Sequence, residues 1–179
     1  MDIAPFVQAI QASPPAEWMR TSVKAMPIVE SVHVLAAATV FGSVFVVDLR
    51  LLGLIDTARP VTRIAREMLR LTWVAFGVAV IAGALMFSAN AHTYVVNTAF
   101  RLKMAALLLA GVNMVVFHAL TYRTVDSWDR SNPVPLPARI AGLTSILLWV
   151  CVICCARWIG FTKGYDFSIP QNTHIDFQF

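Results

Sequence analysis

Residues 31–54 read SVHVLAAATVFGSVFVVDLRLLGL, and this stretch decides the fold. Its ionisable side chains are His33, Asp48 and Arg50, and most of the others are apolar. A helix needs about 20 predominantly apolar residues to cross a bilayer. Inside lipid the backbone polar groups must pair within the segment, which a single segment achieves only as a helix. The stretch therefore predicts a transmembrane helix over about residues 28–54.

Three further apolar blocks of similar length follow along the chain, over about residues 68–89, 100–122 and 139–161. The whole sequence is 58% hydrophobic and 13% charged, whereas soluble domains run nearer half apolar and about a quarter charged. A chain of 179 residues is sized for one domain. We therefore expect an all-α integral membrane four-helix bundle over residues 28–162, with the lipid bilayer as its principal partner.

The segments outside this bundle have a different composition. Residues 1–27 are mixed in character and broken at Ser13-Pro14-Pro15, which predicts short amphipathic helices lying in the membrane interface. They contain no short apolar run with a small-residue cleavage site, so the first membrane helix is expected to direct targeting. Residues 163–179 form a polar tail, which we expect on the surface.

The basic residues carry an orientation signal. The net charge of +4 comes from residues placed between apolar blocks, which argues against nucleic-acid binding and for membrane topology. The first and third connectors carry eight of them, and the opposite side carries six. The eight are Arg50, Arg59, Arg63, Arg66, Arg70, Arg123, Arg130 and Arg139, and the six are Arg20, Lys24, Arg101, Lys103, Arg157 and Lys163. Because basic loops stay inside, both termini are expected on the outer side.

Ionisable residues within the spans sort into two layers. Asp48 follows His33 by 15 residues and His118 follows Lys103 by 15, so each gap is about 22 Å along a helix. The first and third spans run the same way through the membrane, and His33 lies near the start of the first whereas His118 lies near the end of the third. The two histidines are therefore at different depths and cannot ligate one haem. The outer layer holds Glu30, His33, His92, Arg101, Lys103 and Arg157, and the inner layer holds Asp48, Arg50, Arg70 and His118.

The outer layer suggests a cofactor. His33 and His92 are candidate metal ligands, as the two axial ligands of a b-type haem, because bundles build such sites from facing helices. Arg101, Lys103 and Arg157 would then pair with the haem propionates. Alternatively, His33 only hydrogen-bonds a neighbouring helix and His92 is a hydrated loop residue. The same cations also suit a quinone headgroup or an anionic lipid.

The inner layer suggests a buried polar pair. Asp48 and His118 are expected at similar depth on parallel helices, where they would either stabilise the bundle or relay protons. Asn113, near mid-membrane, is expected to hydrogen-bond between helices. Cys151, Cys154 and Cys155 are interpreted as small packing residues, with a copper(I) site that includes buried methionines as the alternative.

A resemblance adds to this reading. Residues 31–54, AFRLKMAALLLAGVNMVVFH (99–118) and LPARIAGLTSILLWVCVICCARWIGF (136–161) resemble a family of small four-helix bacterial inner-membrane proteins of unknown function. More distantly they are similar to the copper-resistance D membrane domain and to di-haem membrane cytochromes. The resemblance matches the first-helix histidine to His33, the lysine that opens helix three to Lys103 and the arginine that ends helix four to Arg157. A di-haem protein needs a histidine pair at each depth, so at most one haem is expected here.

Together these features favour an electron-transfer subunit of the b-type cytochrome kind, exchanging electrons with quinone and an outer-side partner in a bacterial inner membrane. The sequence contains no G-x-G-x-x-G nucleotide motif, so any substrate chemistry would belong to a partner protein. Two alternatives remain open at this point: a copper transport or tolerance protein, and a non-catalytic anchor or assembly subunit. The partner is either another redox or membrane protein or a second copy of the chain.

Overall fold

The computed structural model describes residues 4–131 and 133–162, and within them it is all-helical. Four spans are long and apolar enough to cross a membrane. Three of them are the single helices α3 (Ala25–Leu51), α4 (Val61–Ala89) and α8 (Leu136–Thr162). The other begins as α6 (Thr98–Val116) and continues through a π-helical turn, η1 (Phe117–Thr121), a short 3₁₀ turn, η2 (Tyr122–Thr124), and α7 (Val125–Trp128). The prediction of an all-α four-helix membrane protein is confirmed.

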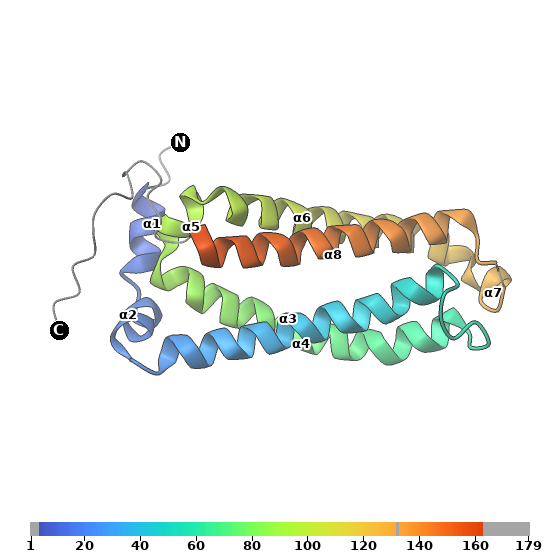
Figure 1. Ribbon diagram of the computed structural model, residues 1–179, viewed down its shortest axis with the longest axis horizontal. Coiled ribbons are helices and arrows are strands. Elements are labelled where there is room, and N and C mark those ends of the chain that lie inside the picture. The colour runs from blue at the N-terminus through green and yellow to red at the C-terminus, as the bar shows by residue number, and fades with distance from the viewer. Residues whose placement is uncertain (1–3, 132, 163–179) are drawn as a thin grey trace, which may run out of the picture.

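The long helices pack as two antiparallel pairs (Figure 1). One pair is α3 with α4, the other is α6 with α8, and contacts between α3 and α8 join them. Small residues on α4 face its partner: Ala75 and Ala82 are buried, and Gly83 lies against the His33 ring of α3. Small side chains let two helix backbones approach closely where apolar burial does not drive association in lipid.

One end of the bundle, here called the α5 end, is covered by short helices (Figure 1). They are α1 (Ala4–Gln11), α2 (Pro14–Thr21) and α5 (Ala91–Val96). The Arg20 guanidinium of α2 donates to the Gln11 carbonyl at 2.8 Å and to the Ala89 carbonyl at 3.3 Å. A cation at the carboxyl end of α4 satisfies an otherwise unpaired carbonyl and complements the helix dipole. The predicted polar tail, residues 163–179, lies outside the described residues.

The opposite end, here called the α7 end, is fixed by two caps. Helix α3 ends in a Schellman motif, in which the Gly53 amide donates to the Arg50 carbonyl and the Leu54 amide to the Leu49 carbonyl, both at 3.0 Å. Gly53 has φ of 75°, which a residue with a side chain adopts at a cost.

The second cap starts α4 at Val61, ahead of the expected residue 68. The Asp129 carboxylate accepts from the Thr62 amide at 2.8 Å and the Thr62 hydroxyl at 2.7 Å. A carboxylate at a helix amino terminus stabilises it through the unpaired amides and the dipole. Part of the arginine-rich connector therefore forms the first turns of α4, where Arg63 and Glu67 form an ion pair at 3.2 Å.

Most of the bundle surface is apolar and uncovered. Leu108 and Leu120 of the third span are 70% and 71% exposed, and Leu147 of α8 is 61% exposed. A contiguous apolar surface of this kind is suited to hydrocarbon rather than water. The chain is therefore a multi-pass membrane protein.

Candidate functional site

His33 lies in the interface between α3 and α4. Its Nδ1 atom is 2.8 Å from the carbonyl oxygen of Ala79. A carbonyl oxygen only accepts hydrogen bonds, so Nδ1 carries the proton and donates. In the neutral imidazole this leaves Nε2 with a free lone pair. Histidines that bind metals are typically held in this way, with the other ring nitrogen donating to a backbone carbonyl or carboxylate.

Gly83 makes room for this imidazole. A Cβ atom added at Gly83 would lie 3.0 Å from Cε1 and 3.3 Å from Nδ1 of His33. Ala79 and Gly83 are one turn apart on α4, so the ring lies along the face that this turn presents to α3. The spacing of four residues puts Ala79 and Gly83 on one face of a helix, but the sequence does not show that His33 packs against this face.

Lys103 and Cys155 belong to the same layer. The Lys103 ammonium acts electrostatically on His33 of α3 and on Cys155 of α8, and Glu30, one turn before His33, acts on the imidazole as well. Cys155 also has a hydrogen-bonding partner in Cys151 on its own helix. Lys103, His33 and Cys155 are all half-buried. Polar side chains of α3, α6 and α8 therefore lie near enough to influence one another electrostatically toward the α5 end.

The structure does not bring the other predicted outer-layer residues to His33. His92 is exposed on α5, and α5 packs against α1, α4 and α6. The rise from Gly83, level with His33, to the end of α4 at Ala89 is already about 9 Å. His92 is thus not positioned opposite His33 as a second axial ligand. Arg101 and Arg157 are also exposed, and Arg157 stacks on the Phe161 ring at 4.8 Å.

Asp48 is buried against α8. Its carboxylate has the Ser145 hydroxyl as a hydrogen-bonding partner, and its backbone lies close to Gly142, where an added Cβ would be 3.1 Å from the Asp48 carbonyl oxygen. Asp48 is 5% exposed, and its Oδ2 atom has no hydrogen-bond partner among the described residues. The Asp48 residue therefore packs against one face of α8, where Gly142 allows the close approach and Ser145 provides the hydrogen bond.

His118 is separate from Asp48. It lies in the π-helical turn η1, is exposed, and donates from Nδ1 to the Met114 carbonyl at 2.9 Å. The prediction that His118 is buried is wrong, and the structure does not pair it with Asp48. It lies near the end of the third span, whereas His33 lies in the first half of α3, which runs the same way.

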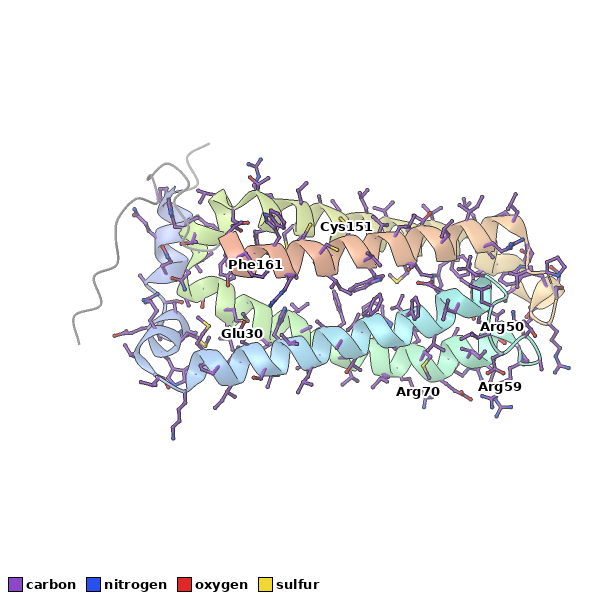
Figure 2. The ribbon with its side chains drawn as sticks, in the orientation of Figure 1. Glu30, Arg50, Arg59, Arg70, Cys151 and Phe161 are labelled. Carbon is purple, nitrogen blue, oxygen red and sulfur yellow. The ribbon has the colours of Figure 1, made fainter. Side chains whose placement is uncertain are left out.

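Several arginine side chains lie toward the α7 end of the bundle (Figure 2). Figure 2 shows Glu30 and Phe161 toward the α5 end, and Arg50, Arg59 and Arg70 toward the α7 end. Arg50 is fully buried; its Nε and Nη2 atoms donate to the Arg59 carbonyl at 3.1 and 3.0 Å. Nη1 of Arg50 has no partner among the described residues.

The four spans and both layers fall within one protein family. Residues 21–162 match the model of DUF6644, a family of unknown function. The chain belongs to this family. No curated protein and no solved structure matches it.

In this DUF6644 protein, further side chains join helices without forming a cofactor site. Asn113 of α6 donates to the Ala141 carbonyl of α8 at 3.0 Å, which confirms its expected role between helices. The Ser43 and Thr72 hydroxyls join α3 and α4 at 2.7 Å. The cysteines are free, and residues 4–131 and 133–162 hold no cluster of three or more His, Cys, Asp or Glu side chains suited to a metal ion.

Proposed function

We propose that this protein is a membrane electron-transfer subunit of the b-type cytochrome kind, in which His33 would ligate the iron of one haem. The observation that carries the proposal is the hydrogen bond from His33 Nδ1 to Ala79, which fixes the ring and leaves Nε2 available. Imidazole nitrogen held in this way inside a helical bundle is the usual protein ligand of b-type haem iron.

The residues around His33 suit such a group in two respects. Gly83 leaves room for the imidazole beside α4, and Lys103 places a cation near the ring, where it would pair with a propionate. His92, Arg101 and Arg157 are exposed and do not add to this set. We therefore propose one histidine ligand from this chain, His33, instead of the pair His33 and His92.

When bound, the haem would accept and pass on one electron at a time. The chain's own contribution is to hold Nε2 in position, to supply a positive charge beside it, and to exclude water by surrounding the site with apolar helices. Electrons would be exchanged with quinone and with an outer-side partner. We also propose that the chain lies in a bacterial inner membrane with its N- and C-termini on the outer side.

The test is a visible absorption spectrum of the full chain, purified in detergent from cells supplied with a haem precursor, with and without dithionite. We expect a sharp b-type α-band in the reduced protein and about one haem per chain. His33→Asn should abolish the band, because the amide can still donate to Ala79 but offers no imidazole to the iron.

His92→Ala is the matched control and should keep the band, since His92 is exposed on α5. A folded, colourless wild-type protein would refute the haem proposal. Metal analysis of the same sample distinguishes the other possibilities: copper lost in His33→Asn would indicate copper handling, and neither metal nor haem would indicate an anchor or assembly subunit.

A further inference from the structure

A groove opens between α4 and the third span toward the α7 end. The packing that joins the two helix pairs runs through α3 and α8, which leaves α4 and α6 on the open side of the bundle. The groove has a volume of about 440 Å³ and is lined by Leu69 and Trp73 of α4 and by Met114, Ala119 and Arg123 of the third span. Ligand-binding grooves in proteins span about 300–1,000 Å³.

The walls of this groove are apolar and face the membrane. Trp73 is 54% exposed, Leu69 is 42% exposed and Met114 is 40% exposed. These residues lie within segments that are long and apolar enough to span the bilayer. The groove therefore opens toward hydrocarbon, and its walls match an acyl chain rather than a polar ligand.

The rim of the groove at the α7 end is cationic. Arg123 lines the groove. Among the described residues the ion pairs join Arg59 with Asp56 and Arg63 with Glu67, so the Arg123 guanidinium is not held in an ion pair. An apolar groove with such an arginine at its rim is complementary to an anionic headgroup with an acyl chain.

The local backbone adds a second observation. The third span changes from α-helix to π-helix at Phe117–Thr121, directly beside the groove. Such turns are rare and often occur at binding sites. His118, in this turn, lines the groove and donates from Nδ1 to Met114, so when protonated it has Nε2 free to donate to a phosphate oxygen.

We propose that this groove binds one anionic phospholipid, with an acyl chain against Trp73 and Met114 and the phosphate at Arg123. The site lies at the opposite end of the bundle from His33 and does not depend on a haem. The arginines collected at this end match the negative surface of the cytoplasmic leaflet.

The test is native mass spectrometry of the full chain, exchanged from detergent into mixtures of phosphatidylglycerol and phosphatidylcholine. We expect one phosphatidylglycerol to be retained in preference to phosphatidylcholine. Arg123→Gln should weaken its binding about fivefold, the effect of one basic residue near an anionic lipid. Arg130→Gln, an exposed arginine at the same end that does not line the groove, should change binding much less.

A second variant tests the acyl-chain contact without altering charge. Ala119→Phe should fill the groove and reduce retention, whereas Ala105→Phe, at an exposed position of α6 outside the groove, should not. Equal loss in Arg123→Gln and Arg130→Gln would mean general attraction to a basic surface and would overturn the proposal. Equal retention of the two lipids, or wild-type retention in Ala119→Phe, would overturn it as well.

Discussion

The Nδ1 atom of His33 and the carbonyl oxygen of Ala79 lie 2.8 Å apart, which joins α3 to α4 through a side chain and a backbone group. The same carbonyl belongs to a turn of α4 that ends at Gly83, whose missing side chain leaves space for the imidazole ring. This relationship fixes the depth and the tautomer of His33 within the helix pair. It is also open to a direct test.

Gly83→Ala should destabilise the α3–α4 pair. Its Cβ would meet Cε1 of His33 at 3.0 Å, so the ring must move and its bond to Ala79 must lengthen. Overpacking of this kind costs about 1–3 kcal/mol. The measurement is thermal unfolding in detergent. Gly77→Ala, on the same helix with no atom within 4 Å of the added Cβ, should leave stability unchanged or raise it by up to about 1 kcal/mol. Equal effects of the two changes would show that His33 is not seated at Gly83.

Gly142→Ala should weaken the junction between the two helix pairs. The added Cβ would lie 3.1 Å from the Asp48 carbonyl oxygen and 3.2 Å from Cβ of Leu51. Neither contact is with the end of a flexible side chain, so α3 and α8 must separate, at a cost of about 1–3 kcal/mol. Gly160→Ala on α8, with open space around its Cβ, is the matched control. A Gly142→Ala protein as stable as the Gly160→Ala protein would contradict the α3–α8 contact.

The sequence predicts the four spans well because each is a long apolar block, and only helices satisfy the backbone in lipid. It does not predict which face of a helix points inward. Helices α3 and α6 are almost equally apolar on all sides, so periodicity carries no signal for the orientation of His33 or His118. In a soluble protein, the apolar stripe of an amphipathic helix shows which face points toward the core.

Two other features of the site depend on contacts distant in sequence. The start of α4 is set by Asp129, which lies 67 residues from Thr62. The sequence places His92 just beyond the second span, and the structure adds that Asn90, with φ of −141°, ends α4 and that His92 belongs to the separate helix α5. Polar residues alone therefore locate the layers, whereas the interior partners Gly83, Gly142 and Ser145 follow only from the packing.

The arginine distribution predicts the topology. Reporter fusions after Arg63 and after Arg130 should report the cytoplasm, because basic connectors are retained on that side. A fusion at Phe179 should report the outer side, since an even number of spans returns the chain to the side on which it began. A cytoplasmic signal from the Phe179 fusion, with reversed signals at the two connectors, would contradict this orientation.

The last prediction concerns the partner of Asp48. The Ser145 hydroxyl of α8 is a hydrogen-bonding partner of the Asp48 carboxylate of α3, whereas Oδ2 of Asp48 has no hydrogen-bond partner among the described residues. Asp48→Ala and Ser145→Ala should each destabilise the bundle, because one buried polar group loses its partner, at about 1–3 kcal/mol. The double variant should cost less than the two single costs together, with a coupling of at least about 0.5 kcal/mol.

His118 provides the comparison for that cycle. It is exposed in η1 and bonded to Met114, so it shares no partner with Asp48. Asp48→Ala combined with His118→Gln should therefore be additive within about 0.5 kcal/mol, measured by unfolding in the same detergent. If Asp48 instead coupled to His118 and was additive with Ser145, Ser145 would not be the partner of Asp48. The pair Asp48 and His118, which the sequence predicts, would then be the correct one. Coupling to Ser145 alone would make Asp48 a residue that positions α8 against α3, with Gly142 providing the close approach.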